Sequence, residues 1–365
     1  MAGDLVLLTG ATGHLGFRTL RTALEHGYNV RAAVRSEAKA ELVRSNPVLK
    51  AINKDDQLSF VIVPDFIEPG AFDEVVKDVK YIIHVASPIP MKAAGDDFEK
   101  FFIQPAVQGT LGVFESARKS GTVKRIVVTS SVVAIVPPKL WFFDKIVDEV
   151  FNAESRQPEM EGPFEVLQVA YIASKVAALN RAEAWIKQEK PDFDVIHVYP
   201  SFILGRDDMA DSTKAFQTGT NAVPLNIALG TADPKTQKAC DRARPSALYP
   251  NSYNNVNDCA KVHVLALDPK VEGNQGFIVS STGMDGMTWK EANRIVAKHF
   301  PDAVKDGRLP NTGGYETIVC KVDSSKTEET FGVKFTNFEA SVVSVVGHYL
   351  EVLDKESKGQ QTNGH

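Results

Sequence analysis

Short aliphatic runs that alternate with helical stretches constrain the fold of this chain more than any other feature. The runs contain little polar alternation, which is typical of strands buried on both faces of a parallel sheet. Amphipathic segments separate most of them, and a strand–helix–strand order implies parallel strands joined by crossover helices. We predict strands at 5–9, 28–34, 58–63, 80–86, 124–130 and 193–199, and helices near 14–26, 36–45, 70–77, 97–119 and 169–190.

The pattern changes after residue 204, where polar, glycine and proline residues become frequent. A helix at 256–268, a strand at 276–281 and a last helix near 337–353 follow. The predicted fold class is α/β, a Rossmann-type doubly wound parallel sheet with a smaller C-terminal substrate-binding region. We assign 1–200 and 253–282 to the Rossmann domain, 201–252 and 283–353 to the substrate-binding region, and 354–365 to a disordered tail.

Composition excludes several classes of function. The chain has 365 residues and a net charge of −5, with no block of basic residues that would indicate a nucleic-acid partner. Its apolar runs are too short to cross a bilayer, and its first residues lack the features of a signal peptide. We therefore expect a cytoplasmic protein without a membrane or nucleic-acid partner.

The cysteines indicate neither a disulfide framework nor a metal site. Cys240, Cys259 and Cys320 are far apart in the sequence, which is typical of a reducing compartment. Cys259 and His263 stand four residues apart on a predicted helix and could form a metal pair. Because a structural zinc takes four ligands and no further ligand cluster is evident, we expect no metal.

A glycine-rich turn follows the first predicted strand. In TGATGHLG, Gly10, Gly13 and Gly16 lead from the strand into the first helix. Glycines in this place permit a tight turn and let backbone N–H groups approach a pyrophosphate at a helix N-terminus. The spacing is GxxGxxG rather than GxGxxG, and a plain strand-to-helix turn is the alternative. The position after the first strand favours a dinucleotide site.

The end of the second strand indicates which dinucleotide is bound. An acidic residue there would hold the ribose 2′-hydroxyl of NAD. This chain has Val34 at that position, followed by Arg35, and Lys39 four residues later. A guanidinium and an ammonium suit a 2′-phosphate, although a solvated basic edge is a common alternative. The charges therefore favour NADPH over NADH.

Tyr171 and Lys175 share one face of a helix in the segment AYIASK. They could be an amphipathic surface pair. They could also be a proton donor with a cation that tunes its pKa. The remainder of the sequence favours the second interpretation.

Several motifs resemble those of a known family when they are taken in order. TGATGHLG, AVRSEAK, HVASP, VVTSS, YIASK and YPSFILG resemble segments of the extended short-chain dehydrogenase/reductases. Within them the chain looks most like the dihydroflavonol-reductase-like group, which includes fungal aldehyde and ketone reductases. The similarity covers nearly the whole chain and is more specific for the superfamily than for the substrate.

The resemblance implies a role for residues at the carboxyl edge of the sheet, where ligands bind in such folds. The backbone of the glycine turn would wrap the pyrophosphate, basic residues would hold the 2′-phosphate, and later loops would contact the adenine, the ribose and the nicotinamide. The residues of the turn are Gly10, Thr12, Gly13, His14 and Leu15, and the basic residues are Arg35 and Lys39. Asp65 and Phe66 would contact the adenine, Ala86 and Ser87 the ribose, and Pro200 and Ile203 the nicotinamide.

The resemblance also implies Ser131, Tyr171 and Lys175 as the catalytic residues, with Tyr171 and Lys175 contacting the cofactor as well. A tyrosine has a pKa of about 10, and a neighbouring Lys175 cation, together with the positive charge of the nicotinamide in the oxidised complex, would favour the phenolate. Tyr171 would protonate the carbonyl oxygen while Ser131 donates a hydrogen bond to it. The implied activity is an NADPH-dependent reduction of an aldehyde or ketone to an alcohol.

Two departures from the family bear on this assignment. Plant cinnamoyl-CoA reductases usually carry NWYCYGK where this chain has VAYIASK, which disfavours a CoA thioester substrate. A serine that often reaches the cofactor phosphates is replaced in FQTGTN, where Thr218 or Thr220 could substitute.

The segment between Ser131 and Tyr171 is a candidate for the mouth of the substrate pocket. It carries several aromatic residues, of which we expect at least half to pack in the core. No basic cluster suited to a nucleotide diphosphate is evident, so we expect a fairly apolar carbonyl substrate; the sequence does not fix the oligomeric state. The aromatic residues are Trp141, Phe142, Phe143, Phe151 and Phe164.

Two other functions are compatible with the fold. An NDP-sugar epimerase or dehydratase would typically retain NAD, which Arg35 and Lys39 disfavour. A regulator that only senses a dinucleotide would not need Ser131, Tyr171 and Lys175 in catalytic order.

Overall fold

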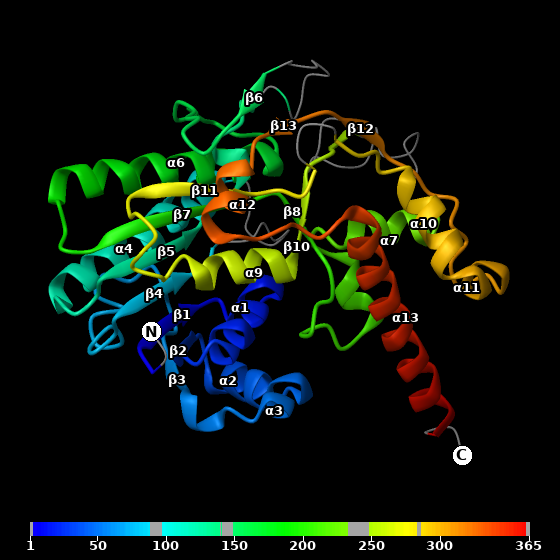
Figure 1. Cartoon of the computed structure of the whole chain (residues 1–365), viewed down its shortest axis with the longest axis horizontal. Helices are drawn as coiled ribbons and strands as arrows, with labels where there is room; N and C mark the ends of the chain where they lie inside the picture. The colour runs from blue at the N-terminus through cyan, green and yellow to red at the C-terminus, as the bar shows by residue number, and fades with distance from the viewer. Residues whose placement is uncertain are drawn as a thin grey trace.

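A parallel sheet of seven strands forms the centre of the computed structural model (Figure 1). The structure describes residues 3–87, 97–138, 140, 149–232, 248–282 and 286–362. The strands lie in the order β11-β7-β5-β4-β1-β2-β3, and every neighbouring pair is parallel. They are β1 Leu5–Thr9, β2 Asn29–Val34, β3 Leu58–Ile62, β4 Tyr81–His84, β5 Arg125–Thr129, β7 Asp194–Pro200 and β11 Gln275–Val279.

This strand order confirms the predicted doubly wound fold class. The chain moves outward from β1 through β2 to β3, and then returns to the other side of β1 with β4. The order therefore reverses between β1 and β4, which is the topological switch point where such sheets bind ligands. Each predicted strand of the sheet is present, with its ends within two residues of the expected ones.

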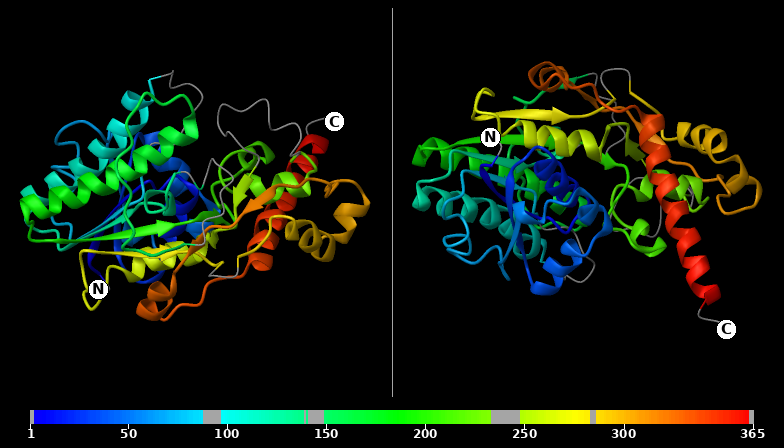
Figure 2. Two further views of the ribbon diagram at one scale, coloured as in Figure 1. Left: turned by 90° about the horizontal axis from the view of Figure 1, so that it is seen from above. Right: turned by 60° about the horizontal axis from the view of Figure 1, so that its bottom comes forward.

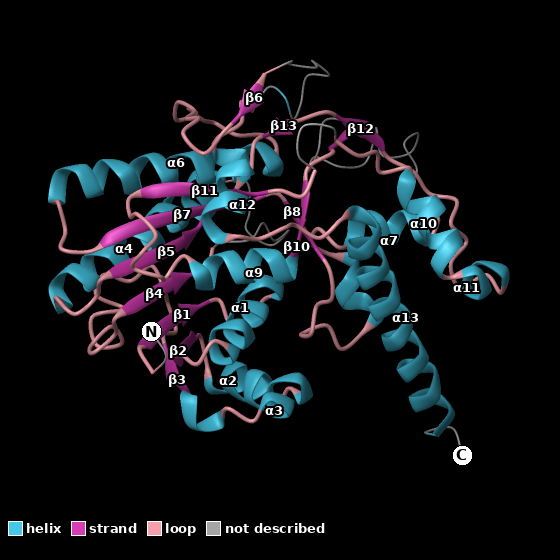
Figure 3. Ribbon diagram, in the orientation of Figure 1, coloured by secondary structure: helices cyan, strands magenta, loops and turns pink. Residues whose placement is uncertain are grey.

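Helices cover both faces of the sheet (Figures 2 and 3). On one face α1, His14–Glu25, packs against α9, Val256–Leu265. On the other face α4, Gln104–Ser120, packs against α6, Leu167–Glu189. Adjacent strand residues such as Leu7 and Leu8 enter different cores and are fully buried. Burial on both sides explains why the strands show no polar alternation.

A second hydrophobic core lies beside the sheet and is built from later elements. Trp289 is fully buried in this core, and its indole N–H donates to the carbonyl of Pro250 at 2.9 Å. The helices around it are η4 Thr213–Gln217, α7 Ala222–Ala228, α10 Glu291–His299, α11 Pro301–Lys305 and α13 Phe338–Thr362. Two short strand pairs complete this region: β8 Phe202–Leu204 pairs with β10 Tyr253–Asn255, and β9 Leu248–Pro250 pairs with β12 Glu316–Ile318.

The remaining elements lie around the large sheet. One of them, α12 at Ser325–Phe331, falls within 283–353 but packs on β11, where the Thr327 hydroxyl donates to the carbonyl of Ile278 at 2.6 Å. The division of the chain into the two predicted regions stays a prediction. The other elements are α2 Glu37–Arg44, α3 Pro47–Ile52, η1 Asp55–Gln57, η2 Glu99–Ile103, η3 Val132–Ala134, and β6 Val150–Phe151 paired with β13 Lys321–Val322.

Two segments differ from the sequence-based expectation. Residues 70–77 form successive turns rather than a helix, because Gly70 has a φ of +79° and several backbone bonds join residues three apart. Phe72 and Val76 nevertheless point into the core, which explains the helix-like apolar spacing. The last helix, α13, continues to Thr362, into the segment predicted to be disordered. Extending an existing helix costs little, and its Lys, Glu and Gln residues are good helix formers.

Close packing at the first turn of α1 predicts that replacing Gly16 strongly destabilises the fold. A Cβ on Gly16 would lie 1.9 Å from the carbonyl oxygen of Gly10, so the backbone must shift. Gly16→Ala should lower the free energy of unfolding by about 2 kcal/mol or more. Gly112→Ala in α4 is the matched control, because a Cβ there meets nothing within 4 Å, and it should stabilise by about 0.5–1 kcal/mol. Denaturant unfolding of both variants measures this, and equal stabilities would contradict the packing.

Candidate active site

The turn between β1 and α1 forms a concave stretch of backbone. Gly10 has a φ of +81°, a left-handed conformation that glycine adopts without strain. A Cβ on Gly10 would lie 2.8 Å from the nitrogen of Ala86, so the ends of β1 and β4 meet through bare backbone. Gly13 caps α1 without a side-chain hydrogen bond, which leaves the first N–H groups of the helix free for an anion. This cradle fits the pyrophosphate of a dinucleotide.

The other residues predicted in this turn lie in different surroundings. Thr12 is half-buried, and Leu15 is buried in the core beneath the turn. The His14 ring hydrogen-bonds the backbone of Arg206, and burial lowers its pKa. The His14 side chain therefore connects the turn to the segment after β8.

A buried carboxylate strengthens this connection. Asp208 accepts from Arg18 of α1 at 2.7 Å and from Arg206 at 3.0 Å, and its side chain is 2% exposed. Arg206 also contacts Glu351 of α13 at 2.7 Å. The spacing of these residues in the sequence gives no sign that they meet, so the network could not be predicted from it.

Arg35 and Lys39 lie at the start of α2, directly after β2. Both are exposed, and within the described residues no acidic side chain pairs with either of them. Ser36 caps the helix by accepting from the backbone N–H of Lys39. Two cationic side chains and a helix N-terminus together fit a phosphate group.

Asp65 and Phe66 lie in the loop after β3, at the same edge of the sheet as the glycine turn. The Asp65 carboxylate accepts from the backbone N–H of Ile67 at 3.0 Å, which shapes the loop. The Phe66 ring is half-buried and packs edge-on against Phe72, with the ring centroids 5.3 Å apart. Both residues are therefore held locally, next to the predicted adenine site.

Residues after β7 approach the centre of this edge. The carbonyl of Pro200 accepts from the Ser131 hydroxyl at 3.5 Å. Ile203 packs against the core on the α1 side of the sheet, and its carbonyl accepts from the Thr220 hydroxyl at 2.5 Å. Thr218 is exposed and bonds within its own turn. Both threonine hydroxyls thus have internal partners, and their contact with a cofactor stays a prediction.

The predicted catalytic side chains come together with Ser87 from three parts of the chain. Ser131 follows β5 and hydrogen-bonds the phenol of Tyr171, which lies on α6. Lys175 lies one turn further along α6, with its Nζ 5.8 Å from the centroid of the Tyr171 ring. The Lys175 ammonium donates to the hydroxyl of Ser87, after β4, at 3.0 Å. The structure therefore joins the ends of β4 and β5 to α6 through these four side chains.

Burial controls the protonation of this pair. Burial raises the pKa of Tyr171 to about 12, although the hydrogen bond with Ser131 lowers it in part. Burial also lowers the pKa of Lys175 to about 8. The expected effect of the Lys175 cation, together with the charge of the oxidised nicotinamide, stays a prediction, because burial and Ser131 account for the pKa of the phenol in the chain alone. Tyr171 keeps its proton at neutral pH, while most Lys175 side chains stay charged.

Thr9 and His84, which are not among the predicted site residues, also belong to this site. They end the adjacent strands β1 and β4, and the Thr9 hydroxyl lies 3.0 Å from Nδ1 of His84. A hydroxyl at the end of an otherwise apolar buried strand, directly before the glycine turn, was the available signal.

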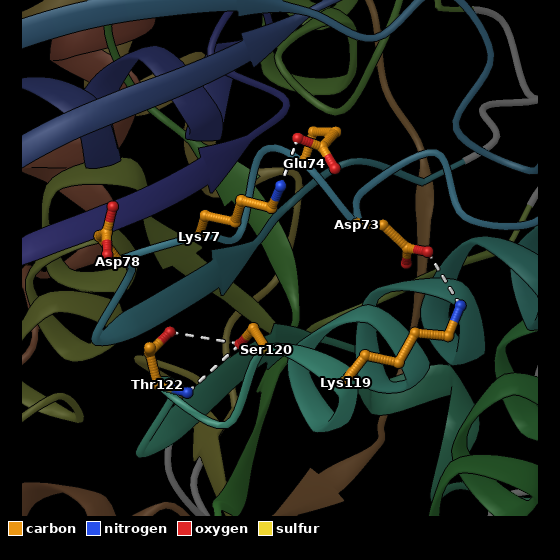
Figure 4. Close-up of a pocket in the computed structure, with 7 residues that line it drawn as sticks. All are labelled: Asp73, Glu74, Lys77, Asp78, Lys119, Ser120 and Thr122. Carbon is orange, nitrogen blue, oxygen red and sulfur yellow. Dashed lines mark hydrogen bonds and ion pairs between the residues drawn. The ribbon is translucent and has the colours of Figure 1, made fainter.

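A surface pocket of about 460 Å³ lies at the opposite edge of the sheet (Figure 4). It is near the amino ends of β4 and β5, far from the predicted catalytic residues. Four of its charged groups form two ion pairs, Lys119 with Asp73 at 2.9 Å and Lys77 with Glu74 at 2.6 Å. It carries none of the predicted chemistry. Its lining consists of Asp73, Glu74, Lys77, Asp78, Lys119, Ser120 and Thr122.

Within the described residues, no cluster of three or more His, Cys, Asp or Glu side chains could hold a metal. Both ring nitrogens of His263 have internal partners: Nδ1 bonds the carbonyl of Cys259 at 2.7 Å, and Nε2 bonds the Thr129 hydroxyl at 2.8 Å. Cys240 lies outside the described residues. In the described part of the chain no helix is long and apolar enough to span a membrane.

The aromatic residues between Ser131 and Tyr171 that the structure describes are packing residues. Phe151 is buried in a core beneath α6, and Phe164 packs with Met160 against α4 and α6. The other three, Trp141, Phe142 and Phe143, lie outside the described residues.

Comparisons with known proteins identify the family of this chain. The model of the NAD dependent epimerase/dehydratase family matches residues 6–279. Ketoreductase CTB6 of Cercospora nicotianae is 45% identical over 362 residues, which cover 98% of each chain. The NAD-dependent epimerase/dehydratase FUM13 of Gibberella moniliformis is 30% identical over 385 residues, which cover 99% of this chain and 98% of the relative.

A solved structure shares the fold. The yeast methylglyoxal/isovaleraldehyde reductase Gre2, complexed with NADPH, aligns with a TM-score of 0.75 and 24% identity. The alignment covers 95% of this chain and 98% of that one.

The buried Lys175 predicts a pH-dependent stability. Its pKa is about 8 when folded and ordinarily 10.5, so between these values the unfolded chain binds a proton that the folded chain does not, and stability rises with pH. Below about pH 8 the buried ammonium costs roughly 3 kcal/mol. Lys175→Met removes the buried charge and should be more stable than the wild type at pH 7. This difference in the free energy of unfolding should shrink by roughly that amount as pH rises from 7 toward 10.5. Thermal unfolding across this range measures it, with the exposed Lys39→Met as control; a gain that does not change with pH would contradict the burial of the charge.

Proposed function

The chain belongs to the NAD dependent epimerase/dehydratase family, among the extended short-chain dehydrogenase/reductases, and we propose that this oxidoreductase is an NADPH-dependent carbonyl reductase. The proposed substrate is an aldehyde or ketone, and the product is the corresponding alcohol. The similarity to a named ketoreductase over 98% of both chains supports this class of reaction.

The arrangement of Ser131, Tyr171 and Lys175 carries the proposal. Tyr171 is the proposed proton donor, and a phenol with a pKa of about 12 is present in its protonated form at neutral pH. Ser131 bonds this phenol and would donate to the carbonyl oxygen of the substrate as negative charge develops there. The Lys175 ammonium beside the phenol would stabilise the phenolate that remains after proton transfer. The bound reduced nicotinamide would supply the hydride.

Arg35 and Lys39 support NADPH as the cofactor. Their exposed charges at the N-terminus of α2 are available to a 2′-phosphate, whereas an acidic residue in this place would suit the 2′-hydroxyl of NAD. The concave backbone from Gly10 to Gly13 would hold the pyrophosphate. A related fold has been solved with NADPH, which is compatible with this choice.

Apolar surroundings of Tyr171 support a fairly apolar substrate. Val133, Ile172 and Val176 are buried next to it, and Met160 packs against the same cluster. Among the described residues this cluster is apolar, which favours a carbonyl compound without charge over a nucleotide diphosphate.

Removal of the Tyr171 hydroxyl tests the proton donor. Tyr171→Phe should lower kcat for carbonyl reduction by about two to four orders of magnitude while leaving the NADPH dissociation constant nearly unchanged. Tyr199→Phe is a matched control, because the Tyr199 hydroxyl is buried and makes no hydrogen bond within the described residues. Steady-state kinetics and a cofactor titration provide the comparison, and full activity of Tyr171→Phe would exclude it as the donor.

A charge reversal tests the cofactor assignment. Arg35→Glu should raise the KM for NADPH by about ten- to a hundredfold, because a charge-assisted contact is replaced by repulsion, and change the KM for NADH far less. Lys187→Glu makes the same charge change at the far end of α6 and should alter neither value. If Arg35→Glu affected both cofactors equally, the assignment of Arg35 to the 2′-phosphate would be wrong.

A further inference from the structure

Thr9 is the one polar residue of β1 whose hydroxyl reaches another strand. It is fully buried at the end of a strand that otherwise reads Leu-Val-Leu-Leu. Its hydroxyl lies 3.0 Å from Nδ1 of His84, its partner in the register of β4, and accepts from the backbone N–H of Ala86 at 3.1 Å. A valine would fill the same volume and suit a buried strand, so strand formation alone does not explain the hydroxyl.

The Thr9 hydroxyl joins two groups of the 84–87 segment. It accepts from the backbone N–H of Ala86 and keeps one proton and a second lone pair, so it can pair with Nδ1 of His84 in either tautomer of the neutral ring. Burial and the nearby charge of Lys175 lower the pKa of His84 to about 4. The imidazole is therefore neutral at neutral pH, and the three-way contact persists throughout that range.

The same short segment ends at the partner of Lys175. Ser87 directly follows Ala86, and its hydroxyl accepts from the Lys175 ammonium at 3.0 Å. Lysine has a long flexible stem, so a buried ammonium requires an acceptor in a fixed place to hold one conformation. A continuous set of contacts thus runs from β1 through the 84–87 segment to α6.

We propose that Thr9 and His84 are positioning residues, which fix the 84–87 segment so that the Ser87 hydroxyl holds the Lys175 ammonium beside Tyr171. The inference rests on the proposed function, in which Lys175 stabilises the phenolate of Tyr171. Thr9 and His84 act through Ser87 and contact neither the substrate nor the reacting atoms.

The titration of Lys175 in the cofactor-free protein tests this directly. Loss of an acceptor disfavours the ammonium, so Ser87→Ala and Thr9→Val should each lower the pKa of Lys175 by about 0.5–1 unit. Thr9→Ser keeps the hydroxyl and should restore the wild-type value. NMR of protein labelled at the lysine side chains measures the shift, and Lys175→Met identifies the resonance.

A control separates positioning from a general loss of packing. Thr327→Val removes another fully buried hydroxyl, which donates to the carbonyl of Ile278, and should leave the Lys175 titration unchanged. In turnover assays Thr9→Val should lower kcat by about ten- to a hundredfold, more than it raises the KM for NADPH.

The possible outcomes are distinct. A folded Thr9→Val protein with a wild-type Lys175 titration would overturn the inference. If Thr9→Val does not fold, Ser87→Ala provides the test. An unchanged Lys175 pKa in Ser87→Ala would show that the Ser87 hydroxyl does not hold the ammonium, and the inference would be wrong. Absence of turnover in the wild-type protein would count against the proposed function alone, since the titration requires no substrate.

Discussion

The site depends on the close approach of β1 and β4 at the switch point. A Cβ on Gly10 would lie 2.8 Å from the nitrogen of Ala86, so the approach requires a glycine. Thr9, one residue earlier, bonds both His84 and Ala86. The same contact therefore shapes the backbone that fits a pyrophosphate and sets the segment whose Ser87 reaches Lys175. In a doubly wound sheet this is the place where a ligand can contact loops from both halves.

Burial of two ionisable groups side by side is the second constraint. It moves Tyr171 and Lys175 in the same sense, toward their neutral forms, by raising one pKa and lowering the other. A phenol that retains its proton suits donation to a developing alkoxide, and a lysine that remains largely charged suits the phenolate left behind. The cost is a buried ammonium that lowers stability, as perturbed groups at functional sites commonly do. Ser87 and Ser131 supply the hydrogen bonds that keep the pair in place.

Sequence patterns predicted the fold well because the strands are buried on both faces and read as unbroken aliphatic runs. They also placed Tyr171 and Lys175 on one helix face, since that spacing is local. The patterns failed at 70–77, where apolar spacing typical of a helix belongs to successive turns around Gly70. Contacts such as Thr9 with His84, or Arg18 with Asp208, join residues far apart in the chain and leave no periodic signal. The effect of burial on Tyr171 likewise depends on the tertiary fold.

We propose that the half-buried Tyr171 acts with NADPH to reduce a carbonyl group. The most direct measurement is the loss of nicotinamide absorbance when the purified protein meets NADPH or NADH with a panel of aldehydes, aryl ketones, ketoesters and diketones. We expect turnover that strongly prefers NADPH and falls with charged substrates. Tightly retained NAD with conversion of a sugar nucleotide, or cofactor binding without turnover of any substrate, would contradict it and favour an epimerase or a dinucleotide-sensing protein instead.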